Sequence, residues 1–163
     1  MTGTRWLSDD ERAAWVRLTA VLELLPAALD FQLGQDVGLT HFDYFTLAML
    51  SEAPDRVLRT SALAARTNAT LPRLSRVLSR LEAAGFVERT PDPNDRRATN
   101  VTLTDAGWEK VVEAAPGHVG AVRRLVLDSL TPEQITQLSA ISTAMLRQLD
   151  PDGRMLATDA GSY

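Results

Sequence analysis

A tight hairpin in the middle of the chain constrains the fold more than any other feature. Residues 86–90 (FVERT) and 98–104 (ATNVTLT) have the composition of two β-strands. The residues between them are rich in proline, asparagine and aspartate, which favour turns. Gly85, directly before the first strand, suits the position that ends a helix. The sequence therefore predicts a hairpin that starts where a helix stops.

Two short helical segments precede this hairpin. The first starts at Thr60, and the second covers residues 71–84. Asn68 or Thr70 serves as the N-cap of the second segment, and Pro72 falls in its first turn, where proline is tolerated. A short helix, a second helix and a hairpin, in this order, are the arrangement of a winged helix-turn-helix.

Two more helices are expected before this central lobe. A capping box at residues 8–11 opens the first, which Pro26 should bend, and Thr40 caps the second. The stretch SEAPDRVLR (residues 51–59) has the composition of a turn. Apolar residues recur every three or four positions along the first helix, as in a seam that packs on another helix: Trp15, Leu18, Leu22, Leu25 and Leu29.

Two long helices are expected after the hairpin. The first starts at Thr104 and has Pro116 and Gly117 in its middle, where a kink or a break is expected. Residues 131–134 form a full capping box that opens the last helix. The predicted fold is mainly α with a small two-stranded β-wing, a winged helix-turn-helix flanked by long N- and C-terminal helices.

The helix at 71–84 has two contrasting faces. At about 100° per residue its leucines gather within roughly 80°, and its arginines gather within roughly 60° on the opposite side. One face would pack, and the other would present guanidinium and hydroxyl groups, as a helix in the major groove of DNA requires. An exposed helix solubilised by arginines is the alternative explanation of this stripe taken alone. The leucines are Leu71, Leu74, Leu78 and Leu81, the arginines are Arg73, Arg76 and Arg80, and Ser75 and Ser79 lie between them.

Positive charge is concentrated in the same part of the chain. The net charge is −4, but residues 56–97 contain nine arginines and four acidic residues, a local charge of +5. A basic centre in an acidic frame is typical of a module that binds a polyanion through one face. Arg96 and Arg97 at the hairpin tip would reach the neighbouring minor groove or its phosphates. Asp95 would pair with a nearby arginine and hold the tip in shape.

Other classes of protein find no support in the sequence. No run approaches the roughly 18 apolar residues of a membrane span, and the N-terminus lacks an apolar signal core, so a cytoplasmic location without a membrane partner is expected. The absence of cysteine excludes disulfides and thiol chemistry. His41 and His118 lack the spacing of a metal site, and no catalytic motif occurs. We therefore predict no metal, no cofactor and no enzymatic activity.

Four short motifs occur together in the central third of the chain. They are T-x-x-L-A from residue 60, R-L-E-x-x-G-x-V-x-R at 80–89, D-R-R at 95–97 and L-T-x-x-G at 103–107. In this combination the chain resembles the MarR family of transcriptional regulators, and the segments HFDYFTLAMLSEAPDRVL and PGHVGAVRRLV resemble actinobacterial members. The resemblance implies that Arg97 enters the minor groove with support from Asp95, while Arg96 contacts the DNA backbone.

The resemblance also implies a homodimer whose terminal helices interlock. Residues 1–149 would form a single MarR-like domain, with dimerisation helices at 8–35 and 105–149, a DNA-binding lobe at 40–104 and a flexible tail at 150–163. Its operator would be palindromic double-stranded DNA with half-sites roughly 34–36 Å apart, and the protein would act as a repressor. The predicted DNA-binding residues are Thr70, Arg73, Ser75, Arg76, Ser79, Arg80, Asp95, Arg96 and Arg97.

A small-molecule effector is a further implication of the resemblance. Its pocket would lie between the dimer helices and the DNA-binding lobe, where a ligand would favour a dimer wrongly spaced for DNA. The residues that would line it are aromatic, and for each of them an ordinary core or interface position is the alternative: Trp15, Phe31, His41, Tyr44 and Phe45.

Two other functions are compatible with these patterns. The first is a helical interaction module that grips an acidic protein through the arginine face. The second is a small-molecule binding protein whose DNA lobe no longer functions.

Overall fold

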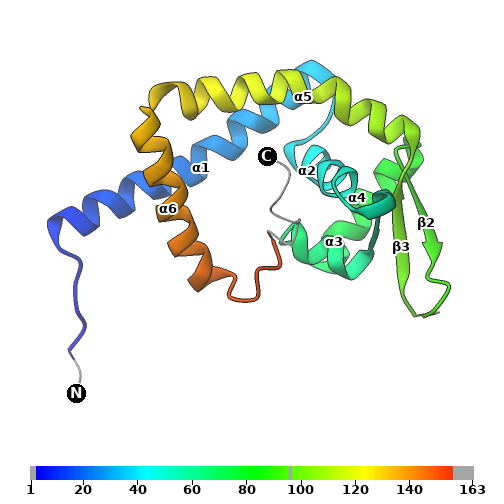
Figure 1. Ribbon diagram of the computed structural model, residues 1–163, viewed down its shortest axis with the longest axis horizontal. Coiled ribbons are helices and arrows are strands. Elements are labelled where there is room, and N and C mark those ends of the chain that lie inside the picture. The colour runs from blue at the N-terminus through cyan, green and yellow to red at the C-terminus, as the bar shows by residue number, and fades with distance from the viewer. Residues whose placement is uncertain (1–2, 96, 156–163) are drawn as a thin grey trace.

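The computed structural model describes residues 3–155 except residue 96, and within them the chain is mainly helical (Figure 1). The order of its elements follows the predicted one, with additions around residue 57 and after α5. The elements are α1 (Asp9–Val37), α2 (His41–Ser51), η1 (Pro54–Arg56), β1 (Val57–Arg59), α3 (Thr60–Arg66), α4 (Leu71–Ala83), β2 (Val87–Pro91), β3 (Thr99–Leu103), α5 (Asp105–Leu125), η2 (Leu127–Ser129) and α6 (Pro132–Leu149).

Most helix starts are fixed by the side chains that the sequence indicates. Ser8, Thr40 and Thr131 each form a complete capping box, because the hydroxyl accepts the backbone N–H three residues on and the side chain there accepts the N–H of the cap. The sequence offers Asn68 or Thr70 as the N-cap of α4. Thr70 is the cap, because its side chain accepts the Arg73 N–H. The capping predictions are therefore confirmed.

The predicted two-stranded wing is part of a three-stranded antiparallel sheet in the order β1-β3-β2. Leu58 pairs with Val101, and Arg89 pairs with Val101 from the other side. The prediction of a plain turn at 51–59 was therefore wrong. Its last three residues form a strand because Leu58 points into the core, and a three-residue strand behind Pro54 is too short to show a periodic pattern.

The helix after the hairpin starts in close contact with it. Thr104 Oγ1 donates to the Gly85 carbonyl at 2.6 Å. A Cβ at Gly107 would lie 2.1 Å from the Phe86 carbonyl oxygen, so only glycine fits here. This contact fixes the direction in which α5 leaves the lobe.

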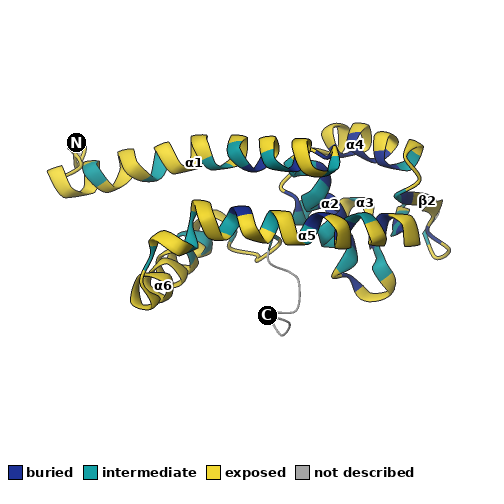
Figure 2. Ribbon diagram, turned by 90° about the horizontal axis from the view of Figure 1, so that it is seen from above, coloured by how far each residue is buried: buried dark blue, intermediate teal, exposed yellow. Residues whose placement is uncertain are grey.

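The long helices α1 and α5 lie side by side and carry the lobe at one end (Figures 1 and 2). α5 runs across Pro116 as one helix, so of the expected kink or break, the break does not occur. Next to Pro116 the helix lies close to α1, since a Cβ at Gly117 would lie 2.8 Å from Asp36 Oδ2. α1 likewise continues through Pro26.

Burial is concentrated in the lobe and in the facing parts of α1 and α5 (Figure 2). The largest buried side chains come from α1, α2, α3, α4 and β3, and they include Leu33, Leu47, Leu63 and Val101. By contrast, α1 buries only Leu29 and Leu33 along its 29 residues, and α6 buries none of its residues. A compact lobe is thus attached to α1 and α5, which pack on each other, and to α6, which buries none of its residues.

Candidate nucleic-acid interface

The buried face of α4 differs from the predicted one at its first residue. Leu74, Leu78 and Leu81 are buried as expected, and Val77 completes the buried stripe. Leu71 is 55% exposed, so its place in the packing stripe was wrongly predicted. The buried stripe is centred between Leu74 and Val77. Leu71, the first residue of the helix, therefore lies at the edge of the stripe and beyond the end of the core.

Two of the three arginines of α4 contact α2. Arg80 forms an ion pair with Asp43, whose side chain is 5% exposed, with 2.5 Å between Arg80 Nη2 and Asp43 Oδ1. The Arg73 guanidinium lies 4.2 Å from the centre of the Phe42 ring. All three arginines are exposed, as the predicted stripe requires, but Arg73 and Arg80 also form the flank that faces α2.

The outward face of α4 carries one arginine and two small hydroxyl side chains. Arg76 is exposed, and its Nε donates to the Pro72 carbonyl at 3.4 Å. Ser75 and Ser79 are exposed beside it, and the Ser79 hydroxyl donates to the Ser75 carbonyl at 3.0 Å. Thr70 is exposed at the start of the same helix. A face of this kind allows close approach to another surface.

An ion pair joins the end of α4 to the hairpin. Arg89 on β2 donates from Nε and Nη2 to Glu82 Oε2 at 3.0 and 2.6 Å, and its backbone N–H donates to Glu82 Oε1. Chiefly because of the side-chain hydrogen bond from Arg89, the pKa of Glu82 is lowered from its usual value. The Arg89 Nη2 also reaches Ser79 Oγ at 3.3 Å. These bonds hold the wing at a fixed angle to α4.

A carboxylate that the sequence reasoning missed organises the wing tip. Asp92 is only 7% exposed and accepts the backbone N–H groups of Asn94 and Asp95 at 2.8 and 3.2 Å. It also accepts from Arg59 Nε at 2.9 Å. The pKa of Asp92 is lowered, first by the Asn94 N–H and then by the charge of Arg59. Asp92 and Arg59 thus lock the tip to the strand before α3.

The predicted support of Arg97 by Asp95 takes the form of a backbone contact. Asp95 Oδ1 accepts the backbone N–H of Arg97 at 3.1 Å, so the carboxylate shapes the chain at Arg97. A pairing of Asp95 with an arginine side chain stays a prediction, and two arginine–carboxylate pairs are described in the wing, Arg59 with Asp92 and Arg89 with Glu82. The spacing Asp92–Asn94 of an Asx turn was the available signal for Asp92. Arg96 lies outside the described residues.

A hollow of about 380 Å³ lies between α4, the start of α3 and the wing tip. It brings three of the predicted DNA-binding residues together, Ser75, Asp95 and Arg97, the last with an exposed side chain. Arg59, Thr60, Ser61 and Leu71 also line it, although the sequence reasoning did not assign them to a site. Basic and hydroxyl groups from separate elements therefore converge beside the outward face of α4.

Three of the five predicted effector residues gather around His118. The ring of His41 stacks on Phe45 and on His118, with centroids 6.4 and 6.1 Å apart, and Tyr44 lies 4.6 Å from His118. The pKa values of both histidines are lowered, chiefly by burial. Burial is also the main cause of the raised pKa of Tyr44. This cluster joins α2 of the lobe to α5.

The remaining two predicted effector residues are more exposed. Phe31 is 71% exposed and Trp15 is 56% exposed. Trp15 precedes Phe31 on α1 by 16 residues, about 24 Å of helix. One helix therefore cannot place both at the same small pocket within a single chain, and the assignment of Trp15 and Phe31 to an effector site stays a prediction.

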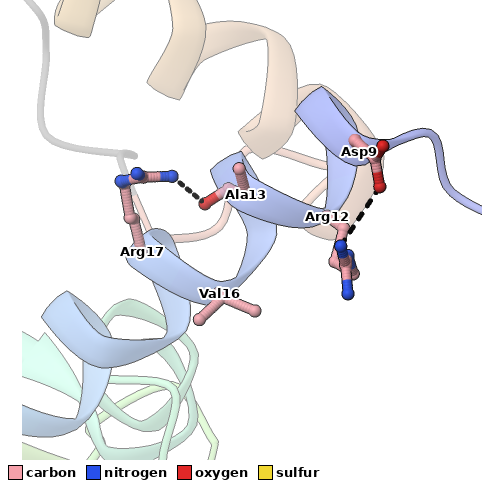
Figure 3. A pocket seen from close by; sticks show the side chains of 5 residues that line it. All are labelled: Asp9, Arg12, Ala13, Val16 and Arg17. Atoms are coloured by element: carbon pink, nitrogen blue, oxygen red, sulfur yellow. Dashed lines mark hydrogen bonds and ion pairs between the residues drawn. The ribbon is translucent and has the colours of Figure 1, made fainter.

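Another hollow lies along the start of α1 (Figure 3). Its lining residues, among them Asp9, Arg12 and Val16, all belong to this one helix. Arg12 pairs with Asp9, and the Arg17 Nη1 donates to the Ala13 carbonyl (Figure 3). A single helix supplies no opposite wall, so we assign no ligand site here.

Comparisons with known proteins agree with this geometry. The model of the MarR family matches residues 37–98. The crystal structure of Sco3205, a MarR family transcriptional regulator from Streptomyces coelicolor in complex with DNA, is 40% identical, covers 93% of this chain and 94% of its own, and superposes with a TM-score of 0.87. The chain belongs to the MarR family.

Two further relatives show the range of the likeness. AbsC, another MarR family transcriptional regulator from Streptomyces coelicolor, is 39% identical over 90% of this chain and 98% of its own, with a TM-score of 0.84. The transcriptional repressor MprA of Escherichia coli is 25% identical over 73% of this chain and 69% of its own. The Streptomyces relatives agree with the actinobacterial resemblance.

These relatives confirm the fold class and the family that the sequence predicts. They are regulators of transcription and not enzymes, as expected. Among the described residues, no helix has the length and hydropathy to cross a membrane.

Proposed function

We propose that this protein represses transcription as a homodimer that binds palindromic double-stranded DNA. Helix α4 enters the major groove, and the wing tip contacts the adjacent minor groove or its phosphates. The observation that carries this proposal is the convergence of Ser75, Arg97 and Arg59 on one hollow beside the exposed face of α4. A solved relative in complex with DNA supports it.

The dimer is proposed from apolar surface that a single chain leaves exposed. Helix α6 buries none of its residues, although it has a complete capping box and an apolar stripe. Residues 8–35 and 105–149 would form the dimerisation helices and 40–104 the DNA-binding lobe. Isologous pairing would bury the exposed apolar residues of these helices: Trp15, Val16, Val21, Leu22, Leu24, Phe31, Val112, Val119, Leu125, Ile135, Leu138 and Ile141.

We also propose that a small molecule regulates the dimer. The cluster of His41, Tyr44, Phe45 and His118 joins the lobe to α5, so a ligand inserted there would change the angle between them. A change of this angle alters the distance between the two copies of α4, and with it the fit to two half-sites. Trp15 and Phe31 lie outside this ring cluster within one chain, and we propose that they line the ligand site only if the dimer brings them to it.

The test is DNA binding by the full chain as a function of salt. We expect a duplex selected by the protein from a random pool to bind about 10³–10⁵-fold more weakly at 200 mM than at 50 mM salt, if six to ten phosphates are contacted. Arg97→Ala should weaken binding and leave the solution mass of a dimer unchanged. Arg5→Ala, before α1 and outside the proposed dimerisation helices, is the matched control and should bind as the parent does.

Two results would contradict the proposal. One is binding that does not respond to salt. The other is the solution mass of a single chain at all protein concentrations, since half-site pairing requires two copies.

A further inference from the structure

Leu71 is the only large apolar side chain of α4 that is exposed, and all residues of α4 are described. It is the first residue of the helix, and it lines the hollow between α4 and the wing together with Ser75 and Arg97. Every other leucine of α4 is buried in the lobe. Leu71 thus lies beyond the packed core of the lobe, and its side chain is available for contact with another surface.

The backbone around Leu71 is rigid. Thr70 caps the helix by accepting the Arg73 N–H at 3.4 Å, and Pro72 fixes its own φ in the first turn. In a helix-turn-helix the N-terminal residues of the recognition helix contact the base edges. Leu71 is thus held at the end of α4 that would lie deepest among the bases.

An exposed leucine at this place gains free energy only against another apolar group. The major-groove edges of the bases consist of hydrogen-bond donors and acceptors, with one exception, the C5-methyl group of thymine. The neighbours of Leu71 in the hollow, Arg59, Thr60 and Ser61, suit phosphate oxygens instead. The apolar and the polar parts of the hollow therefore match a base edge and the backbone, respectively.

We propose that Leu71 is a specificity-determining residue that reads the methyl group of a thymine in each half-site. This inference rests on the proposed DNA-binding function and adds to it one base preference and the residue responsible. Burial of one methyl group is equivalent to about fourfold in affinity, which sets the expected size of the effect at each contact.

The experiment removes single methyl groups from the DNA. A duplex selected by the full-length protein from a random pool is resynthesised with deoxyuridine in place of one thymine at a time, and each dissociation constant is measured for the parent, Leu71→Ala, Leu71→Met and Ser75→Ala. For the parent we expect one position per half-site at which deoxyuridine weakens binding about fourfold. Leu71→Ala should bind the thymine and deoxyuridine duplexes equally at that position.

The control variants separate contact from folding. Leu71→Met keeps an apolar side chain and should retain most of the methyl discrimination, and Ser75→Ala should retain all of it. Because Leu71 is 55% exposed, Leu71→Ala should unfold at the same denaturant concentration as the parent.

Two outcomes would overturn the assignment. The first is a parent for which no thymine methyl matters, and the second is a methyl effect that Leu71→Ala keeps in full. In both cases the selected duplex is still bound, so the proposed function stands. Failure of the parent to select any duplex would instead refute the proposed function, and this assignment with it.

Discussion

The ion pair between Asp43 of α2 and Arg80 of α4 offers a direct test of how the lobe holds its exposed helix. The Asp43 side chain is 5% exposed and that of Arg80 is 58% exposed. Asp43 Oδ1 accepts from Arg80, and its Oδ2 accepts the Thr40 N–H at 3.1 Å as part of the capping box. Asp43→Ala removes both bonds at once.

The expected loss follows from these two contacts. Loss of a helix cap costs about 1 kcal/mol. The charge-assisted bond to Arg80 contributes about 1 kcal/mol more, less than a fully buried bond would, because the exposed guanidinium regains water. We therefore expect Asp43→Ala to lower the free energy of unfolding by about 2 kcal/mol. Asp43→Asn keeps an oxygen for the Thr40 N–H and should lose about half as much.

The assay is urea denaturation followed by circular dichroism, at one fixed protein concentration because a dimer gains stability from association. Arg80→Ala and the double variant complete a cycle, in which we expect a coupling free energy of about 1 kcal/mol between Asp43 and Arg80. Asp10→Ala, in the exposed first turn of α1, is the matched control and should change stability by no more than about 0.5 kcal/mol. A coupling free energy near zero would show that the ion pair does not fasten α4 to α2.

Two further predictions concern α5 and its contacts. Since burial lowers the pKa values of His41 and His118, the unfolded chain binds protons more readily, and stability should fall as the pH drops below the ordinary histidine value of 6.5. Urea midpoints measured between pH 7.5 and 5 should show this fall in stability, and His118→Gln should make the fall smaller. The charge of Asp30 acts against burial at His41, because it raises the pKa of that histidine. A flat profile in the parent would refute the burial argument. Gly107→Ala should cost about 1–3 kcal/mol, because its Cβ meets the Phe86 carbonyl oxygen, whereas Gly120→Ala in the same helix has open space and should be neutral or stabilising. Equal urea midpoints for the two alanine variants would contradict this.

Local signals made most of the fold predictable from the sequence. Helix starts are determined by residues within one turn, so the capping boxes at Ser8, Thr40 and Thr131 identified three helices. Gly85, with φ of 78°, ends α4 as predicted. By contrast, β1 has only three residues, and it exists because β3 pairs with it across 41 to 45 residues of sequence.

The residue types of the candidate site could be predicted from the sequence, but the contacts between these residues only in part. A helical wheel shows which residues of α4 share a face, but not which flank meets α2. For this reason Arg80 was expected to point outward although Asp43 binds it. Arg59 and Asp92 are 33 residues apart, and only the folded sheet brings the first strand against the wing. No local pattern could have shown that pair.

The pairing of arginines with acids changes what the positive charge of the lobe can do. Among the nine arginines at 56–97, at least four have carboxylate partners: Arg56 with Asp105, Arg59 with Asp92, Arg80 with Asp43 and Arg89 with Glu82. These four stiffen the lobe, but a paired guanidinium adds less to counterion release than one without a carboxylate partner.

The charge available for DNA is therefore smaller than the arginine count suggests. Arg73, Arg76 and Arg97 are exposed and form no ion pair within the described residues, which gives six such side chains in the proposed dimer. Arg96, outside the described residues, would add two more. Six to eight phosphate contacts correspond to a slope of about −5 to −7 in a plot of log affinity against log salt, whereas nine arginines from each chain would give about −16. A slope near the larger value would mean that the ion pairs open on DNA, and that the arginines of the lobe are not the rigid supports described above.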